Sequence, residues 1–335
     1  MSLAPIPITT IPGFKFGHYT DADAATGCTA IVAPQGATGG VDVRGAAPAS
    51  RETDLLRPEN TVEQAHAVVL SGGSAFGLEA ASGATRELEE RGIGLDVGVA
   101  HVPIVCSSCL FDLAFGRPDI RPSSAAGILA VRDALERDPS EPLAEGSVGA
   151  GTGATVGKLA GPERAMKAGL GARAFQLGDL QVGAVSAVNA VGNVVDPATL
   201  APIAGMRASA DSMEILDMEE AMISMAEQTT MPLDRTNTTI SCIVTNATLT
   251  KAQATKVAQM AADAYAHAIR PTHTSNDGDT IYVLASGALD AASSASYPID
   301  LIGLVATRAL EAAICAGCTT AEGLFGLPSY QDALA

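Results

Sequence analysis

The residues best suited to chemistry lie near the three-quarter point of the chain, where Asn237 precedes Thr238 at the start of an apolar, strand-like run. If the peptide bond between them breaks, Thr238 becomes a new N-terminus whose α-amine can act as the base for its own side-chain hydroxyl. One residue then supplies both nucleophile and base. The competing interpretation is an ordinary turn before a strand.

A glycine-rich segment from Gly149 to Lys158 resembles a nucleotide-binding loop but fails its tests. A phosphate loop needs glycine where the chain has Thr152, and Ser or Thr where it has Leu159. The dinucleotide fingerprint fits only in a relaxed form, with no predicted strand before it. The segment carries few side chains, so it lets backbone amides and the Lys158 ammonium approach a reacting centre closely.

Two carboxylates, Asp277 and Asp279, stand in a polar turn that enters a strand-like run. Because side chains alternate along a strand, the two can share one face. A free α-amine has an unperturbed pKa of about 7.7 to 8.0. Aspartates would raise that pKa and orient the amine, whereas a nearby Lys158 would lower it. The alternative is a capping turn, or a calcium loop without its distal Glu.

Cysteines offer a second candidate chemistry, because Cys106 and Cys109 form one CxxC pair and Cys315 and Cys318 another. Together they resemble a zinc site, although roughly 200 residues separate the pairs and no His stands beside them. Cys315 and Cys318 also fall on a helical apolar stripe, as expected of small buried hydrophobes. We predict reduced thiols, no metal and no cofactor, with zinc at the CxxC pairs as the alternative.

Other nucleophile and base pairs are weaker. Ser74 lies in a segment that resembles a nucleophile elbow, but Phe76 replaces the final glycine, so Ser74 is predicted to cap a helix. The five histidines show no metal-ligand spacing, and most are predicted to be structural or exposed. A serine or cysteine triad therefore lacks a positioned base, which favours a base supplied by the nucleophile's own amine.

Hydrophobic periodicity predicts the elements that hold these residues. Strands are expected at residues 28–32, 67–70, 182–188, 240–244 and 281–284. Helices are expected at residues 74–90, 124–135, 212–226, 251–269 and 301–313. The two kinds alternate irregularly, so helices layered around two sheets are favoured over a regular doubly wound sheet.

Composition sets the class of protein. The 335 residues are 47% hydrophobic, enough for a buried core, and we predict one catalytic domain over residues 1–335. The formal net charge of −17 argues against binding to nucleic acid or to an anionic membrane surface. Charged residues are expected to interrupt every long apolar stretch before 18 residues, and no export signal is visible. A cytoplasmic enzyme for small peptides or amides is expected.

Five ordered segments together resemble the self-processing hydrolases that include L-aminopeptidase/D-esterases, β-peptidyl aminopeptidases and nylon-oligomer endohydrolases. They are Leu70 to Ala80, Gly149 to Lys158, the strand ending at Asn189, Asn237 to Ile240 and Asp277 to Thr280. The resemblance spans most of the chain. It implies an α/β (α+β) fold, a four-layer αββα sandwich resembling N-terminal-nucleophile hydrolases, and a homotetramer of protomers cleaved into residues 1–237 and 238–335.

The same resemblance implies a role for each candidate residue. The bond between Asn237 and Thr238 is the autocleavage site, and Thr238 is the nucleophile with Asp277 and Asp279 behind it. Lys158 and Asn189 are its active-site partners, with the Asn189 amide as oxyanion donor.

Two further residues in the matching regions, Phe111 and Gly151, are candidate substrate contacts. Aminopeptidase members carry a Glu-containing segment that holds the substrate's free amine in the region of residues 105–111. No carboxylate appears here before Asp112, so an endo-type or acyl-selective amidase stays open beside an aminopeptidase.

Three hypotheses follow. The first is an autoprocessed N-terminal-threonine amide hydrolase that works through an acyl-enzyme. The second is an acyltransferase with the same nucleophile, which would pass the acyl group to an amine instead of water. The third is an uncleaved, non-catalytic or metal-binding scaffold that uses the CxxC pairs.

Overall fold

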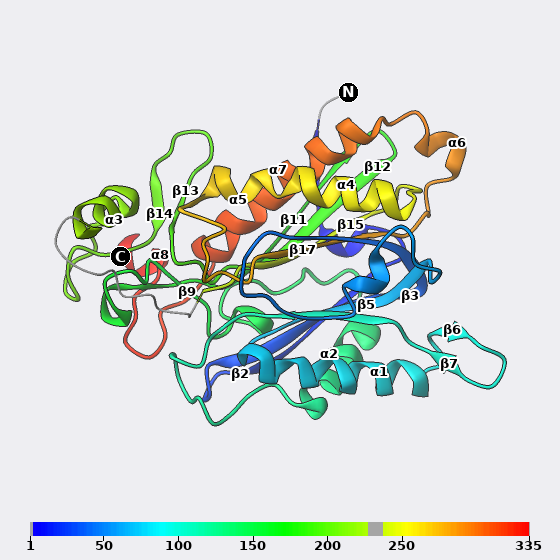
Figure 1. Cartoon of the computed structure of the whole chain (residues 1–335), viewed down its shortest axis with the longest axis horizontal. Helices are drawn as coiled ribbons and strands as arrows, with labels where there is room; N and C mark the ends of the chain where they lie inside the picture. The colour runs from blue at the N-terminus through cyan, green and yellow to red at the C-terminus, as the bar shows by residue number, and fades with distance from the viewer. Residues whose placement is uncertain (1–2, 227–236, 335) are drawn as a thin grey trace.

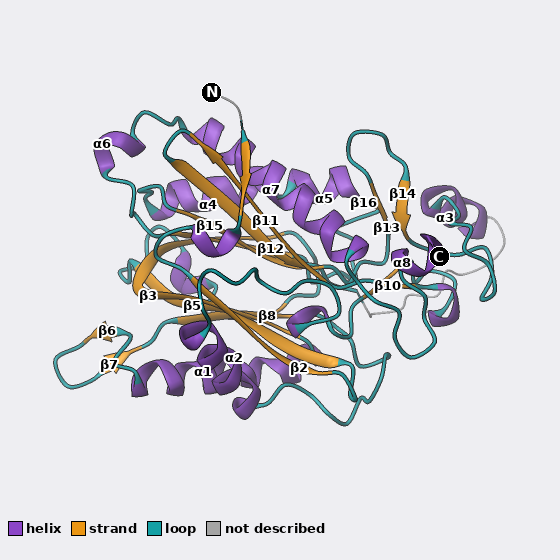
Figure 2. Ribbon diagram, turned by 180° about the vertical axis from the view of Figure 1, so that it is seen from behind, coloured by secondary structure: helices purple, strands orange, loops and turns teal. Residues whose placement is uncertain are grey.

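Helices and strands form four layers in the order helices, sheet, sheet, helices (Figure 1). The computed structural model describes residues 3–226 and 237–334. Figure 2 shows the two strand layers from behind, between one group of helices above and another below. The upper group is α4 (Lys251–Ala261), α5 (Asp263–Ala268) and α7 (Ile299–Thr319), and the lower group is α1 (Glu79–Glu90) and α2 (Ser124–Glu136). The predicted αββα sandwich is confirmed.

One continuous ladder of strands makes both sheet layers. Its order is β1 (Ala4–Ile6), β11 (Leu170–Leu177), β12 (Leu180–Ala187), β15 (Ile240–Thr245), β17 (Thr280–Ala285), β3 (Thr26–Val43), β5 (Gln64–Ser71), β8 (Val105–Cys109) and β4 (Ala49–Arg51), with β2 (Lys15–Asp21) paired to the start of β3. The β3 ladder shifts register between Val32 and Ala37, where Gly36 has a φ of 76°. Because β3 bends there, its two ends lie in different sheet layers.

Side chains that alternate along the central strands build two apolar interfaces in the upper half. On β17, Tyr282 and Leu284 point between the sheets, whereas Ile281 and Val283 point toward α4 and α7. The lower helices pack through small residues: a Cβ added at Gly83 of α1 would lie 1.8 Å from the Ser124 carbonyl oxygen of α2. The abundance of Gly and Ala thus permits close approach of the layers.

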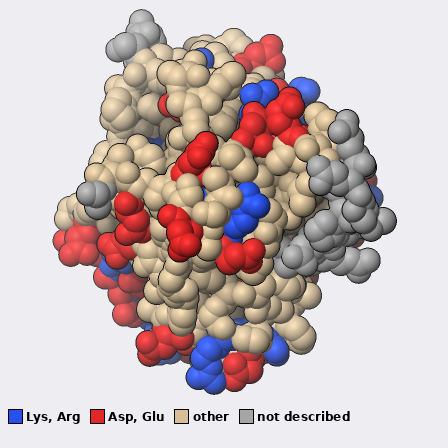
Figure 3. All heavy atoms as spheres, turned by 90° about the vertical axis from the view of Figure 1, so that its left-hand side faces the viewer, with Lys and Arg blue, Asp and Glu red and all other residues tan. Residues whose placement is uncertain are grey.

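Smaller elements lie around this sandwich. They are β6 (Leu95–Asp96), β7 (His101–Val102), β9 (Thr155–Val156), β10 (Met166–Lys167), β13 (Asn193–Val195), β14 (Pro202–Ala204), β16 (Ile269–Arg270), α3 (Met218–Ala226), α6 (Ala291–Ser294) and α8 (Tyr330–Leu334). The face in Figure 3 carries several groups of acidic side chains with few basic ones between them, as the net charge of −17 predicts.

The helix α7 (Ile299–Thr319) is the longest apolar element among the described residues. Its 21 residues have a mean hydropathy of 1.6 over an 18-residue window, so it is long and apolar enough to span a bilayer by length and composition alone. Arg308 and Glu311 nevertheless interrupt its apolar run, as expected. In the structure 67% of this window is buried, because α7 packs on β11 and β12 as a core helix.

The predicted elements are found with shifted boundaries. The helix expected at 251–269 is divided at Ala262 into α4 and α5, and the helix expected at 212–226 begins only at Met218. Ser74 does not cap α1, since it starts a 3-10 turn at Ser74–Leu78 with a φ of 53° and makes no cap bond. Strands β2, β8 and β11 were not predicted, because their runs contain polar or small residues.

Candidate active site

The predicted nucleophile and the paired carboxylates meet at one end of the central strands. Strands β15 and β17 are parallel and neighbours, with Ile240 opposite Thr280, so the residues that precede both strands lie together. An isolated parallel bridge between Asn237 and Asp277 extends this pairing beyond the strands. The topology therefore places Thr238 beside the turn that carries the two aspartates.

Asn189 reaches Thr238 from the other neighbour of β15. Strand β12 is antiparallel to β15, with Ala187 opposite Ile240, so the chain that leaves β12 passes the start of β15. The backbone N–H of Thr238 donates to the Asn189 carbonyl oxygen at 3.0 Å. The strand register alone accounts for this contact.

Lys158 completes the group from the glycine-rich segment. Its backbone N–H donates to the Val191 carbonyl oxygen at 3.2 Å, which holds the segment beside residues 189–192. Its Nζ donates to the Asn189 carbonyl oxygen at 3.0 Å and to Asn189 Oδ1 at 2.9 Å. Thr238 N and Lys158 Nζ each lie 3.0 Å from the Asn189 carbonyl oxygen. The two nitrogen atoms are therefore near each other.

The Thr238 hydroxyl lies against the peptide bond that precedes it. Oγ1 donates to the Asn237 carbonyl oxygen and accepts the Gly278 backbone N–H at 3.2 Å. A Cβ added at Gly278 would lie 2.8 Å from Oγ1, so the absence of a side chain at Gly278 makes this approach possible. The Thr238 residue is only 5% exposed.

The two carboxylates have different surroundings. Asp279 Oδ1 accepts the Thr239 backbone N–H at 2.8 Å, and its Oδ2 accepts the His273 N–H at 3.1 Å. Asp277 Oδ2 accepts the Thr274 N–H at 2.6 Å, but its buried Oδ1 has no hydrogen-bond partner among the described residues. Burial and the nearby Asp279 charge raise the pKa of Asp277 to about 6, although Thr274 and Lys158 oppose the shift.

The Asn189 side-chain amide holds the surrounding loops together. Its Oδ1 accepts from Lys158 Nζ and from the Thr155 N–H at 3.0 Å, and its Nδ2 donates to the Phe111 carbonyl oxygen at 2.8 Å. The oxyanion role predicted for this amide stays a prediction.

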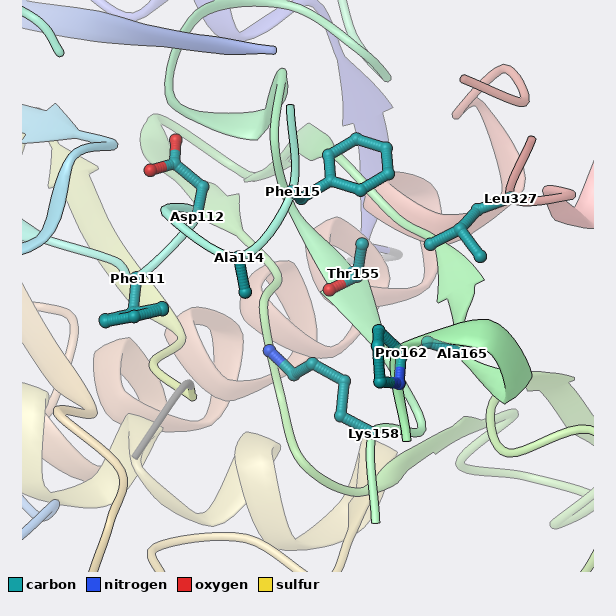
Figure 4. A pocket seen from close by; sticks show the side chains of 9 residues that line it. All are labelled: Phe111, Asp112, Ala114, Phe115, Thr155, Lys158, Pro162, Ala165 and Leu327. Atoms are coloured by element: carbon teal, nitrogen blue, oxygen red, sulfur yellow. The ribbon is translucent and has the colours of Figure 1, made fainter. Parts of the chain in front are cut away.

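A cavity of about 60 Å³ lies beside Lys158. Figure 4 shows its lining, with the Lys158 ammonium pointing toward Phe111 and Ala114 and with Phe115 and Leu327 on the other side; the full set is Phe111, Asp112, Ala114, Phe115, Thr155, Lys158, Pro162, Ala165 and Leu327. The lining is mostly apolar, and Phe111 is part of it. Gly151 is not, because it is buried where an added Cβ would lie 2.2 Å from the Leu170 nitrogen. Its predicted contact with substrate gains no support from this position.

Comparison with known proteins assigns the chain to a family. The model of Peptidase family S58 matches residues 7–330. The chain belongs to Peptidase family S58. It is 40% identical to the "Uncharacterized aminopeptidase ML1167" of Mycobacterium leprae, over 96% of this chain and 92% of that protein. It is 31% identical to the 6-aminohexanoate-oligomer endohydrolase of Paenarthrobacter ureafaciens, over 83% of this chain and 74% of the relative.

Solved structures support the same fold assignment. The Burkholderia sp. beta-aminopeptidase matches 98% of this chain and 92% of its own, with a TM-score of 0.65 and 20% identity. The L-aminopeptidase D-Ala-esterase/amidase of Ochrobactrum anthropi, described as a variant of the Ntn hydrolase fold, matches 98% and 90% with a TM-score of 0.68 and 18% identity. This S58 peptidase therefore has an Ntn-type fold and is a hydrolase of amide or peptide bonds.

A second buried group of charges supports the loops of this S58 peptidase, and we call it the Asp112–Lys167 cluster. Asp112 accepts the Gly73 N–H and the Thr26 hydroxyl, both at 2.7 Å. Lys167 Nζ donates to the carbonyl oxygens of Gly151 and Ala154 at 3.1 Å each, and to that of Ala168. Burial lowers the pKa of Lys167 to about 7 and raises that of Asp112 to about 6.

The cysteines are buried within the packing of the S58 fold. Cys106 and Cys109 lie three residues apart on β8, so their side chains point to opposite faces of the strand. Burial raises the pKa of Cys106 to about 12 and also raises that of Cys318. Within residues 3–226 and 237–334, no group of three or more His, Cys, Asp or Glu side chains is arranged to hold a metal ion. The zinc alternative therefore has no support from the geometry.

One histidine near the site was missed by sequence reasoning. His273 Nδ1 lies 2.9 Å from Asp279 Oδ2, and its ring stacks on Tyr265 with ring centroids 5.3 Å apart. The available signal was its position six residues before Asp279 in the same polar turn. A histidine in a turn that carries two aspartates can contact one of their carboxylates.

Proposed function

We propose that the chain cleaves itself between Asn237 and Thr238, and that Thr238 then acts as the N-terminal nucleophile of an amide hydrolase. The observation that carries the proposal is the bond from Thr238 Oγ1 to the Asn237 carbonyl oxygen, which belongs to the peptide bond to be broken. The Gly278 N–H, 3.2 Å from the same Oγ1, helps to fix the hydroxyl there. The hydroxyl thus lies next to its first substrate.

Maturation has two steps. Thr238 Oγ attacks the Asn237 carbonyl carbon, the C–N bond breaks, and the nitrogen keeps its proton and takes the one released by the hydroxyl to become the Thr238 amine. The product is an ester between Asn237 and the Thr238 side chain. Water then opens the ester, which leaves a carboxylate on Asn237 and restores the hydroxyl of Thr238.

Turnover uses the same atoms on a second amide. The α-amine of Thr238 takes the hydroxyl proton as Oγ attacks the substrate carbonyl, and it passes that proton to the leaving amine. Water hydrolyses the resulting acyl-enzyme. Lys158 Nζ, bound to the same Asn189 carbonyl oxygen as the Thr238 nitrogen, keeps the amine and hydroxyl in register. Asn189 Nδ2 is our proposed oxyanion donor.

The cavity beside Lys158 points to the substrate class. Its volume of about 60 Å³ equals roughly two water molecules at about 30 Å³ each, so it suits a small apolar group next to the scissile amide. Phe111, in its wall, keeps its proposed role as a substrate contact. The relatives are named for aminopeptidase and oligomer-endohydrolase activity, and we propose peptides or small amides as substrates of this chain.

The deciding experiment compares the wild-type protein with Thr238→Ala and Thr239→Ala by intact mass spectrometry. The fractions 237/335 and 98/335 of the 33.8 kDa chain correspond to pieces of about 24 kDa and about 10 kDa. Thr239→Ala is the matched control, because the buried Thr239 Oγ1 has no hydrogen-bond partner among the described residues. We expect both pieces in wild type and Thr239→Ala, and an intact chain in Thr238→Ala. A wild-type chain that stays intact after long incubation contradicts the proposal.

We also propose that the processed protomers assemble into a homotetramer, as the family resemblance implies. Light scattering coupled to size-exclusion chromatography measures the mass directly. A mass near four times 33.8 kDa supports the tetramer, and a mass of one protomer excludes it.

A further inference from the structure

His273 is attached to the active site through one oxygen atom of Asp279. Asp279 Oδ2 accepts the His273 backbone N–H at 3.1 Å, and the imidazole Nδ1 lies 2.9 Å from the same atom. The Thr272 hydroxyl also donates to this oxygen at 3.3 Å. Because an ionised carboxylate only accepts hydrogen bonds, this contact is a hydrogen bond to it in the tautomer that carries the proton on Nδ1.

The other Asp279 oxygen holds the backbone next to the nucleophile. Oδ1 accepts the Thr239 N–H at 2.8 Å, and Thr239 follows Thr238 directly. Asp279 is 3% exposed, so water does not replace these donors. A change in the orientation of this carboxylate would therefore change the position of the peptide that follows Thr238.

Tyr265 of α5 fixes the imidazole and the same peptide unit. The rings of Tyr265 and His273 stack with centroids 5.3 Å apart and planes inclined by 20°. The Tyr265 hydroxyl donates to the Thr239 carbonyl oxygen at 3.0 Å. Both backbone polar groups of Thr239 are thus held, the N–H through Asp279 and the carbonyl through Tyr265.

The His273 backbone is also unusual, because its φ is 54°. Non-glycine residues rarely adopt this left-handed conformation, although Asn, Asp and His do so more often than others. The conformation directs both the backbone N–H and the ring Nδ1 of one residue to one carboxylate oxygen.

We propose that His273 is a positioning residue, whose Nδ1–H keeps the Asp279 carboxylate directed at the Thr239 N–H and thereby holds Thr238 in its reactive position. The proposal rests on the function proposed for Thr238. It also separates the two carboxylates by their partners: both Asp279 oxygens are held by hydrogen bonds, whereas Asp277 Oδ1 has no hydrogen-bond partner among the described residues.

Three substitutions at His273 distinguish the effect of its side-chain hydrogen bond from the effect of its positive φ. His273→Asn places an N–H donor close to the position of Nδ1 and tolerates a positive φ. His273→Gly tolerates the same φ without a donor. His273→Ala lacks the donor and is strained as well. The comparison of His273→Asn with His273→Gly therefore reports on the donor alone.

The measurements are the rate of cleavage before Thr238, followed by intact mass, and kcat and KM of the cleaved fraction on a small amide. For His273→Gly we expect both the cleavage rate and kcat to fall by about 10-fold to 100-fold, the range typical of supporting partners, with KM nearly unchanged. His273→Asn should recover most of the loss. Equal rates in His273→Gly and wild type, or an equal loss in His273→Asn and His273→Gly when both are folded, would overturn the proposal.

A readout without activity keeps this test separate from that of Thr238. In protein labelled with ¹⁵N-histidine, with His273→Asn to assign the signal, we expect the His273 ring to carry its proton on Nδ1. A ring protonated only on Nε2 would overturn the proposal even in an active enzyme. A wild-type chain that never cleaves would instead contradict the role of Thr238, whatever the state of His273.

Discussion

Two groups of buried charges lie close to the glycine-rich segment, and they differ in what is left for a ligand to bind. In the active-site group, Lys158 lines a cavity and the buried Asp277 Oδ1 has no hydrogen-bond partner among the described residues. In the Asp112–Lys167 cluster, both Asp112 oxygens accept a hydrogen bond and Lys167 Nζ meets three carbonyl oxygens. An ammonium has only three donors, so Lys167 has none to spare.

The comparison separates buried charge that does chemistry from buried charge that builds structure. Lys158 and Lys167 lie in the same part of the sequence, and residue type does not distinguish them. The distinction comes from the atoms that remain open to a ligand. Asp112 also lines the cavity beside Lys158, but both of its oxygens accept hydrogen bonds, whereas Asp277 Oδ1 has no hydrogen-bond partner among the described residues. In the Asp112–Lys167 cluster, the fixed loops include the one that ends at Lys158.

The largest expected effect tests the first half of the comparison. Lys158→Met keeps the alkyl stem and removes the ammonium that binds the Asn189 carbonyl oxygen. We expect cleavage before Thr238 and amide hydrolysis each to fall by about 100-fold to 1,000-fold, as for loss of an electrostatic group in an active site. The melting temperature should change little. Intact mass and calorimetry provide the two measurements, and cleavage at the wild-type rate would show that Lys158 is structural as well.

The second prediction tests the structural half. Lys167→Met removes one donor from each of three buried carbonyl oxygens, of which those of Gly151 and Ala154 keep a backbone N–H partner. We therefore expect the free energy of unfolding to fall by about 1 to 3 kcal/mol. Urea unfolding measures this change. The matched control is Lys251→Met, because Lys251 Nζ also donates to three carbonyl oxygens, at 2.8 to 3.0 Å, in a different loop. If Lys167→Met slowed cleavage far more than Lys251→Met at a similar loss of stability, the division between the two groups would fail.

Much of the fold follows from local patterns in the sequence. Apolar runs with β-branched residues mark β12, β15 and β17, and these three neighbouring strands bring Asn189, Thr238 and the aspartates to one edge. The strand β8 was missed because Val105–Cys109 contains two serines, which are buried only because β5 and β4 cover both edges. Polar residues in a central strand become acceptable only once their neighbours are known.

The rest of the site depends on contacts between distant segments. Lys167 and Asp112 are 55 positions apart, from 167 − 112, and nothing local to either residue shows that glycine loops will close over them. Likewise, the prediction that most histidines are structural or exposed missed His273, whose role depends on the ring of Tyr265 in a separate helix. Spacing along the chain points to the proposed nucleophile and carboxylates, but it does not point to the groups that hold them.

The third prediction concerns pH and compares one carboxylate from each group. Burial raises the pKa of Asp112 and of Asp277 to about 6, above the ordinary value of 3.8. Between about pH 4 and 6 the unfolded chain has released these protons, whereas the folded protein still holds them. The free energy of unfolding therefore falls as pH rises across this range. In Asp112→Asn the decrease in the free energy of unfolding should be smaller by on the order of 2 kcal/mol. Urea unfolding from pH 4 to 7 measures this difference. A slope equal to wild type would contradict the raised pKa of Asp112.

The smallest expected effect tests whether the cavity beside Lys158 is the substrate-binding part of the active-site group. Ala114 lies in its wall and is itself exposed, so Ala114→Leu can narrow the cavity without disturbing the core. We expect KM to rise by about 3-fold to 10-fold for amides with a bulky acyl group, a change of about 0.6 to 1.4 kcal/mol, and to change less for the smallest amides. Ala252→Leu, on the exposed face of α4, is the matched control. Because cleavage before Thr238 needs no external substrate, Ala114→Leu should mature at the wild-type rate. An unchanged KM for every amide would mean that substrates bind elsewhere and that Lys158 acts on the chain's own peptide bond without lining the binding site.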